Sequence, residues 1–415
     1  MLVVLALSIA ASQPLRLEDA WSQTRARSTR LRAAAAAVDA ADADAAVAGR
    51  WLPDPQLQLS GATDALTTQE GENNVEVEVQ QTLPWPMETW ARQSGSQALV
   101  RAAQQDRALT ELVAWRELTT AYVELVAAVE TLEVRRSLLE VATKVSSAAG
   151  QRAAAGESAQ IDASFAAVDV AAAESAVAAA ESSVGAAGER LCQELGVMAC
   201  PEFEVVWPTT LGAAPVTDED IADAVERRSD VQAAVERAAA ARAHSDAAAW
   251  ERLPAPTIAV VAVGERSELD AAEGKILDDD ALLGLRLSIP LPLFSFGQGT
   301  VAAAQAQQTR RDAELDAVRL QAFHATRVAV VGWQAAVRAR ASWEKVEPRL
   351  QESQRWLADG YVAGVVDLTT LLVGRDRLSR ARVDALGARR AEALAAVDVF
   401  AALGRLPSAF QPGAP

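Results

Sequence analysis

Two short segments of the chain, residues 75–80 and 283–289, alternate strictly between apolar and polar positions. A period of two puts neighbouring side chains on opposite faces of a β-strand, so each segment predicts a strand with one apolar and one polar face. The polar faces carry three charged residues, Glu76, Glu78 and Arg286. Less regular segments at 56–60 and 257–260 predict the partner strands. The loops between partners, 64–74 and 265–280, are acidic and are expected to be solvated.

Elsewhere, apolar residues recur every three or four positions, which predicts amphipathic helices. The clearest stripe is Leu109, Leu112, Trp115, Leu118, Tyr122 and Leu125. Helices are expected over about 17–49 and 218–251, and two much longer ones over about 88–149 and 299–357. About sixty helical residues span about 90 Å, so the long helices must lie beside others. Pro348 predicts a kink or break in the second long helix.

The chain repeats itself once. Trp51-Leu52-Pro53 recurs as Arg252-Leu253-Pro254, and Leu195-Gly196 recurs as Leu403-Gly404. Such landmarks keep their order and nearly constant spacing, which indicates two copies of one unit of helix, strand pair, long helix, turn and helix. The predicted organisation is a first repeat, a linker, a second repeat and a tail: residues 13–197, 198–216, 217–405 and 406–415.

Composition favours helices over a compact aromatic core. Half of the 415 residues are hydrophobic, but only 5% are aromatic, and alanine runs such as 33–37 favour helix. We therefore expect a mainly α fold with a small β part. The formal net charge of −17 argues against nucleic acid as a partner, because phosphate neutralisation needs a basic face.

The N-terminal segment indicates export. Residues 1–12 form an apolar run that ends in small residues, which predicts a secretory signal peptide. The sequence has no run of eighteen uncharged apolar residues, so we expect no transmembrane helix. The two cysteines, Cys192 and Cys200, would form a local disulfide in an oxidising compartment or remain free thiols, and the sequence leaves both open.

Four short strands in a chain of long helices leave two open sheet edges, which invite aggregation. Three copies would contribute twelve strands to a closed barrel, and the apolar-out, polar-in alternation favours a barrel in an outer membrane. Glu76, Glu78 and Arg286 would then face the lumen. Aromatic residues near the strand ends would form the membrane-interface belt: Trp51, Trp85, Trp90, Trp250, Phe294 and Phe296. The alternative is a small sheet packed on helices in a soluble protein.

The doubled unit, with an L-x-x-A phrase near each start (residues 17–20 and 221–224), resembles the TolC-like outer-membrane efflux protein family. The strand entries Leu52-Pro53 and Leu253-Pro254 are similar to that family's, and residues 288–299 resemble the heavy-metal and multidrug branch. The resemblance implies a homotrimeric conduit with a barrel in the outer membrane and an α-helical tunnel in the periplasm. It also implies a periplasmic adaptor protein and an inner-membrane pump of the resistance-nodulation-division class as partners.

The resemblance places a periplasmic gate at the two helix turns, with Gly156 and Gly364 in the turns that dock the adaptor. Relatives commonly carry an aspartate where this chain has Val373, so the sequence departs from the pattern. The nearest carboxylates, Asp367, Asp162 and Glu157, are the constriction candidates, with helix capping or simple solvation as the alternative. Arg152 and Tyr361 are expected to pair across the turns in the closed state.

Enzyme patterns are missing from the sequence. His244 and His324 have no cysteine or histidine nearby, and no phosphate-binding loop is present. We expect neither catalysis, nor a cofactor, nor a bound metal. Two alternatives to the efflux conduit stay open: a soluble periplasmic coiled-coil protein of structural or adaptor type, and the outer-membrane conduit of a type I protein secretion system.

Overall fold

The computed structural model describes residues 14–64, 73–156, 159–211, 217–271, 274–292 and 296–410. The predicted signal peptide therefore lies outside the described residues. The chain divides into two compact units, and each draws on both sequence repeats. The helical unit comprises 1–34, 107–231 and 319–415, and the strand-bearing unit comprises 35–106 and 232–318.

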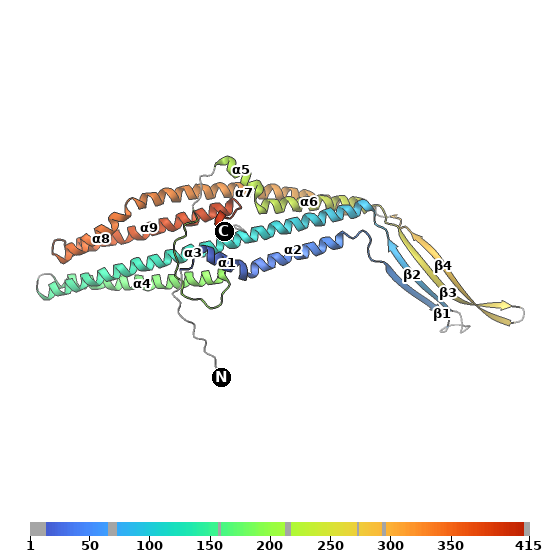
Figure 1. Ribbon diagram of the computed structural model, residues 1–415, viewed down its shortest axis with the longest axis horizontal. Helices are drawn as coiled ribbons and strands as arrows, with labels where there is room; N and C mark the ends of the chain where they lie inside the picture. Colours follow the sequence, from blue (N-terminus) through green and yellow to red (C-terminus); the bar gives the residue numbers. More distant parts are fainter. Residues whose placement is uncertain are drawn as a thin grey trace, which may run out of the picture. The chain divides into compact units, whose positions relative to one another are not determined.

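The two repeats contain matching elements in the same order (Figure 1). Those of the first are α1 (Leu17–Arg27), α2 (Thr29–Ala48), β1 (Gln56–Thr63), β2 (Asn73–Thr82), α3 (Pro86–Ala154) and α4 (Gln160–Leu195). Those of the second are α5 (Asp218–Arg227), α6 (Ser229–Trp250), β3 (Thr257–Ala271), β4 (Gly274–Ser288), α7 (Gln298–Glu344), α8 (Glu347–Val362) and α9 (Leu368–Ala402). A short 3₁₀ turn, η1 (Ser408–Phe410), follows. The predicted mainly α fold with a small β part is confirmed.

The first helix of each repeat is broken, so the prediction of one continuous helix was wrong in both. The backbone is extended at Ser28 and at Arg228. Each break supplies polar partners for the next helix: the Ser28 hydroxyl accepts a hydrogen bond from the Leu31 amide at 3.3 Å, and the Asp230 carboxylate accepts two from the Arg228 guanidinium. Such local caps outweigh the helix propensity of the alanine-rich sequence around them.

The long helices differ between repeats. The first, α3, runs unbroken for 69 residues, whereas its counterpart is divided into α7 and α8 with Pro348 in the first turn of α8. The break predicted from this proline is confirmed. Gly196 and Gly404 adopt positive φ angles of 69° and 68° just after α4 and α9, as expected for glycines that end helices.

The helical unit has its core around α3. The predicted stripe is confirmed, since Trp115, Leu118 and Tyr122 are fully buried, although Leu109 is only half-buried. The Tyr122 hydroxyl lies 2.7 Å from the carbonyl oxygen of Leu15 and 2.9 Å from that of Val206. It thereby holds together the N-terminal segment and the linker between repeats, which form an isolated parallel bridge at Leu15 and Val205.

The strand-bearing unit contains one antiparallel sheet in the order β1-β2-β3-β4, so its central pair joins the two repeats (Figure 1). β3 and β4 are much longer than predicted, because they pair as far as Ala271 and Gly274. The interpretation of 265–280 as a solvated loop was therefore wrong. Backbone pairing tolerates this acidic sequence, and Arg266 forms a cross-strand ion pair with Asp279.

One helix, α4, is long and apolar enough to cross a membrane by length and composition, contrary to the expectation that none would be. Alanine supplies most of that apolar character. Only 11% of its most apolar window is buried within the chain. Small side chains of this kind also let neighbouring helices approach closely.

Candidate functional site

The two helix turns of the helical unit share one local geometry. Gly156 ends the turn after α3 with φ +75°, and Gly364 ends the turn after α8 with φ +76°. Each glycine amide donates a hydrogen bond to a carbonyl three residues earlier, at 3.1 Å and 3.0 Å. Only glycine adopts such a backbone routinely, so both turns depend on it.

Two helical hairpins, α3–α4 and α8–α9, contain the two turns. Arg152 of the first hairpin and Tyr361 of the second lie together. The guanidinium carbon of Arg152 is 5.6 Å from the centroid of the Tyr361 ring, within cation–π range. Tyr361 is 3% exposed and belongs to a small apolar cluster with Val145, Ala149, Ala166, Leu368 and Leu371. The cluster joins α3, α4, α8 and α9 just behind the two turns, so the hairpins meet at this point.

The two described constriction candidates, Asp367 and Asp162, have different surroundings. Asp367 is exposed and caps α9: its carboxylate accepts hydrogen bonds from the Thr370 hydroxyl at 2.6 Å and the Thr370 amide at 2.9 Å. These hydrogen bonds lower the pKa of Asp367. Asp162 is half-buried in the first turn of α4, and no hydrogen bond or ion pair joins it to Asp367 in the described part of the chain. Glu157 lies outside the described residues.

An ion pair that sequence reasoning missed lies about two helical turns farther along the hairpins. Asp169 of α4 pairs with Arg375 of α9, and their side chains are only 23% and 12% exposed. Burial raises the pKa of Asp169, and the neighbouring Arg375 only partly offsets that rise. Asp169 stands seven positions after Asp162 and Arg375 four after the buried Leu371, so helical periodicity was the available signal.

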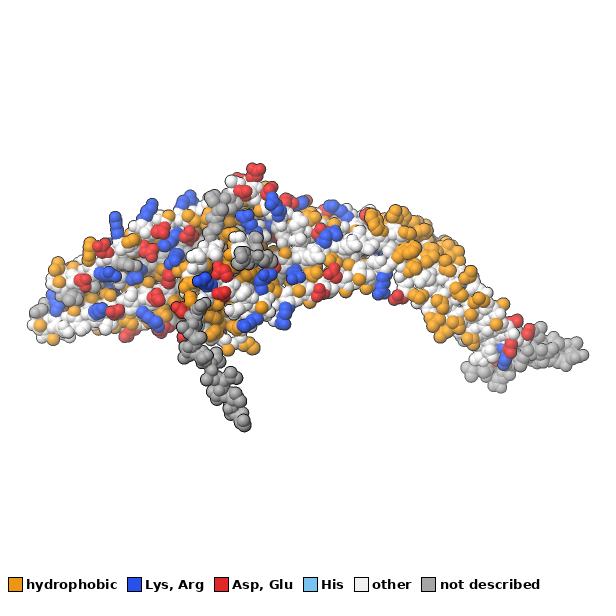
Figure 2. Space-filling view, viewed as in Figure 1, with side chains coloured by type: hydrophobic (Ala, Val, Ile, Leu, Met, Phe, Trp, Pro, Cys, Tyr) orange, Lys and Arg blue, Asp and Glu red, His pale blue; other side chains and the backbone are white. Residues whose placement is uncertain are grey.

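The sheet of the strand-bearing unit has one apolar face, which is exposed. Figure 2 shows hydrophobic side chains gathered over the strands. The residues of this face are 37–81% exposed and come from all four strands: Leu57, Leu59, Val75, Val77, Val79, Ile258, Val260, Leu283, Leu285 and Leu287. An apolar surface of this kind is typical of a strand face in contact with lipid.

The opposite face holds the three charged residues predicted for it, and they contact one another. The Arg286 guanidinium donates to Glu76 at 2.7 Å and also to Glu78. Arg286 belongs to β4 and the two glutamates to β2, so the arginine side chain crosses β3. Ala259 and Val261, on the β3 strand between them, are buried.

Aromatic side chains occur where the strands meet the helices. Trp51, Trp85, Trp90, Trp250 and Phe296 are all exposed. The indole of Trp85 donates a hydrogen bond to the Leu253 carbonyl at 3.1 Å, which links the two repeats at this level. Phe294 lies outside the described residues.

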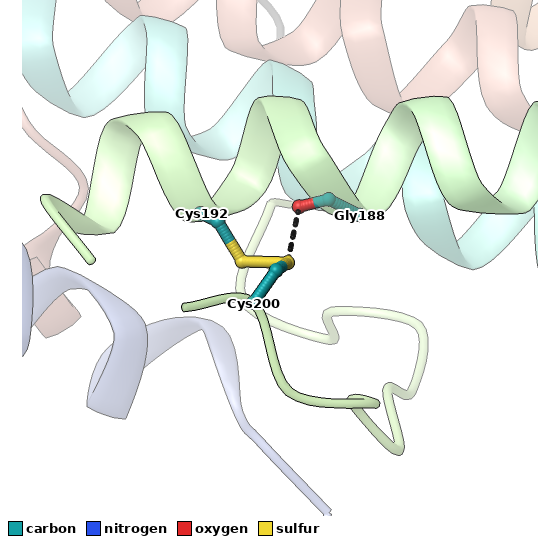
Figure 3. The surroundings of a disulfide bond; sticks show 3 residues. All are labelled: Gly188, Cys192 and Cys200. Atoms are coloured by element: carbon teal, nitrogen blue, oxygen red, sulfur yellow. Dashed lines mark hydrogen bonds between the residues drawn. A yellow bond between two sulfur atoms is a disulfide. The ribbon is translucent and has the colours of Figure 1, made fainter. Parts of the chain in front are cut away.

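The two cysteines are joined by a disulfide at the C-terminal end of α4 (Figure 3). The Cys200 sulfur lies 3.3 Å from the Gly188 carbonyl oxygen. The bond fixes the start of the linker against α4. Of the two alternatives that the sequence left open, the structure has the bonded one. Among the described residues, no group of three or more histidine, cysteine, aspartate and glutamate side chains is placed to hold a metal ion.

Solved structures share this fold. The channel protein CusC aligns with a TM-score of 0.78 and 15% identity, covering 96% of both chains. VceC from Vibrio cholerae gives 0.76 and 18%, covering 94% of this chain and 96% of its own. The open-state channel MtrE from Neisseria gonorrhoeae gives 0.75 and 17%, covering 94% and 89%. At these identities the likeness shows the fold, and comparison with curated proteins gives no match.

A family model identifies the chain more directly. The model described as outer membrane efflux protein matches residues 20–197 and 221–405. The two matched segments span both repeats and together account for most of the sequence. They include the paired strands, the long helices and both turns. The chain belongs to the outer membrane efflux protein family.

Proposed function

We propose that this chain is the outer-membrane conduit of a tripartite efflux system and conducts substrate passively from the periplasm to the exterior. The two-faced sheet is the observation that carries the proposal. Its exposed apolar face suits lipid, whereas its charged face would cost several kcal/mol in contact with lipid and therefore suits a water-filled lumen. In a soluble coiled-coil protein, the apolar face of such a sheet would be exposed to water, which is unfavourable.

The sheet also supports a homotrimer. Four strands are too few to close a barrel, since about eight give an interior just wide enough for side chains. β1 and β4 are the edges of the sheet, and both carry exposed apolar residues. Three copies that pair β1 of one with β4 of the next close twelve strands and remove the edges that would otherwise aggregate.

In this proposal the energy for transport comes from partners. The turns at Gly156 and Gly364 dock a periplasmic adaptor protein, which links the conduit to an inner-membrane pump of the resistance-nodulation-division class. The chain itself performs no chemistry. The aromatic belt around Trp51 and Trp250 sets the depth of the barrel in the membrane.

The second hairpin, α8–α9, is the proposed moving part of the periplasmic gate. Its first helix, α8, is separated from α7 by the break before Pro348, whereas α3 has no such break. Near the turns, the second hairpin is held to the first hairpin by the apolar cluster around Tyr361, by Arg152 on the Tyr361 ring, and by Asp169 with Arg375. Opening requires these contacts to yield. Asp367 and Asp162 are the described candidates for carboxylates that the widening tip exposes to the permeating solute.

Single-channel recording in planar bilayers tests the proposal. In cell fractions, the protein should be found with outer membranes. After purification in detergent, it should migrate as a heat-modifiable trimer and give long-lived conductance steps. An Asp367→Ala variant alongside should reduce cation preference if this carboxylate belongs to the constriction. Unchanged selectivity would remove Asp367 from the gate and leave the conduit intact. Protein that stays soluble without detergent and gives no steps would refute the conduit.

A further inference from the structure

The ion-pair cluster on the polar face of the sheet spans three strands. Neighbouring strands lie about 4.8 Å apart, so β2 and β4 are separated by about twice that distance. The Arg286 side chain covers the gap, with Ala259 as its register partner on the intervening strand. Glu78 is only 8% exposed beneath it, whereas Arg286 itself is 52% exposed. The guanidinium therefore forms the surface that a solute passing along this face would meet.

The register places all the described charges of the sheet on one face except one ion pair. Residues paired directly across antiparallel strands point to the same side. Glu76 pairs with Val263, and two positions farther Glu265 pairs with Asp280. The polar face thus carries five described carboxylates and one described basic residue: Glu76, Glu78, Glu265, Asp278, Asp280 and Arg286. The Arg266–Asp279 pair lies on the opposite face.

The charge of this face changes along the strands. Arg286 lies near the end of β4 that continues into α7. In the register, Glu78 and Glu76 lie two and four positions farther toward the hairpin end, and the remaining carboxylates lie beyond them. Together, Glu76, Glu78 and Arg286 give each copy a net charge of −1, whereas the two glutamates alone would give −2. A solute entering from the helices would meet a nearly balanced wall first and an acidic one afterwards.

We propose that Arg286 is a specificity-determining residue for transport, which sets how strongly the barrel prefers cationic and neutral solutes over anionic ones. The inference rests on the proposed function, because it requires the polar face to line a lumen. It concerns the charge of the wall and assigns no binding site. A lumen lined by one sign of charge concentrates the oppositely charged solute, and the number of uncompensated charges sets the extent.

Four versions of the cluster test the proposal with side chains of similar size. Per copy the net charge is −2 in Arg286→Gln, −1 in the native protein, 0 in the triple variant E76Q/E78Q/R286Q, and +1 in E76Q/E78Q. The measurement is the K⁺ to Cl⁻ permeability ratio from reversal potentials of single channels in a salt gradient. The ratio should fall stepwise along this series, by about two-fold per step in 0.1 M salt, and the steps should shrink in 1 M salt, where the Debye length is about 3 Å.

Arg266→Gln is the matched control, because it removes one arginine from an ion pair on the other face of the same sheet. Its permeability ratio should stay near the native value. A flat series with normal conductance steps would overturn the proposal, as would an Arg266→Gln shift as large as that of Arg286→Gln. If one variant fails to form heat-modifiable trimers, the remaining three charge states still define the trend. A native protein that gives no steps at all would instead refute the conduit.

Discussion

The two hairpins of the helical unit are built on one plan and differ in one respect. α3 enters its turn as a single helix of 69 residues, whereas the second repeat reaches its turn through α7, a break and the 16-residue α8. The joint consists of Lys345 and Val346, and Pro348 is the second residue of the helix that follows. One hairpin is therefore continuous with its long helix, and the other is jointed to it.

Contacts show the same difference. The jointed hairpin is closely packed on itself: a Cβ added at Gly374 of α9 would lie 2.7 Å from a methyl carbon of Leu357 in α8. It is joined to the first hairpin by the apolar cluster around Tyr361, by Arg152 on Tyr361 and by Asp169 with Arg375. Farther from the turns, Arg389 and Arg390 of α9 pair with Glu130 and Glu124 of α3. A hairpin packed this closely on itself can move as a rigid body when the contacts near the turns yield. The continuous hairpin lacks the joint that such a motion needs.

Putting a proline into the continuous helix should have the largest effect. Thr143 is an exposed residue in the interior of α3, and Thr143→Pro removes a helical hydrogen bond and clashes with the preceding turn. The free energy of unfolding should fall by about 3 kcal/mol or more. Chemical denaturation of the detergent-solubilised protein measures it, with Thr143→Ala as the control. A loss no larger than the control's would mean that α3 tolerates a joint.

The reciprocal change is Pro348→Ala. Pro348 lies in the first turn of α8, where an amide has no helical partner, so its replacement should cost little stability. It should let α7 continue into α8 and stiffen the jointed hairpin. Single-channel recording should then show fewer openings. More frequent openings would contradict the role of the joint.

Breaking the half-buried ion pair should have the next largest effect. Arg375→Ala leaves the Asp169 carboxylate buried without its partner, which costs about 2–3 kcal/mol for a pair this buried. The contact between the hairpins should weaken, and open probability should rise by about 30- to 140-fold, since 1.4 kcal/mol is about tenfold. Arg380→Ala is the control, because Arg380 pairs with Asp376 on the exposed side of the same helix. Equal effects in the two variants would mean that the Asp169–Arg375 pair does not hold the hairpins together.

Removing the cation–π contact should have a smaller effect. Arg152→Ala deletes the guanidinium over the Tyr361 ring, a contact of about 0.5–1 kcal/mol at a partly exposed site. Open probability should rise about two- to fivefold. Tyr361→Phe retains the ring and should stay near the native value. A larger effect in Tyr361→Phe than in Arg152→Ala would mean that the Tyr361 hydroxyl, and not the Arg152 guanidinium, stabilises the contact between the hairpins.

The smallest effect is a pH response at the start of α9. Hydrogen bonds from Thr370 lower the pKa of Asp367, so its capping contribution is present above the ordinary aspartate pKa of about 4 and is lost as the pH falls through the lowered value. Amide hydrogen exchange in the first turn of α9 should therefore gain protection from pH 3 to pH 6, after correction for intrinsic exchange rates. In Asp367→Asn the gain should disappear. A gain that persists in the variant would place the titrating group elsewhere.

Local patterns were sufficient to predict most of the fold. Strict alternation located β2 and the helix-side part of β4, and Pro348 located the break between α7 and α8, because each signal acts within a few residues. The breaks at Ser28 and Arg228 escaped notice, since a short polar cap hardly interrupts a helical pattern. The outer halves of β3 and β4 were also missed, because backbone hydrogen bonds pair them whatever their charge.

The site was predictable to a lesser extent. Strict alternation predicted that Glu76, Glu78 and Arg286 would share the polar face, and the internal repeat predicted that Arg152 and Tyr361 would lie at matching turns. Helical periodicity places Arg375 on the same face as the buried Leu371, but its pairing with Asp169 depends on how α4 and α9 pack. Asp367 was expected to be either a gate residue or a helix cap. The structure has it capping α9, and a part in the gate remains a prediction.

The order of the strands has a consequence for how the chain folds. β1 and β2 form a hairpin early in the chain, but a two-stranded hairpin alone is marginally stable in water. Its partner β3 belongs to the second repeat, so the pairing of β2 with β3 must wait until the intervening helices have been synthesised. Contacts of such long range form slowly because loop closure costs entropy before the contact stabilises anything. The β1–β2 hairpin, with its exposed apolar face, thus needs protection during export until the second half of the chain arrives.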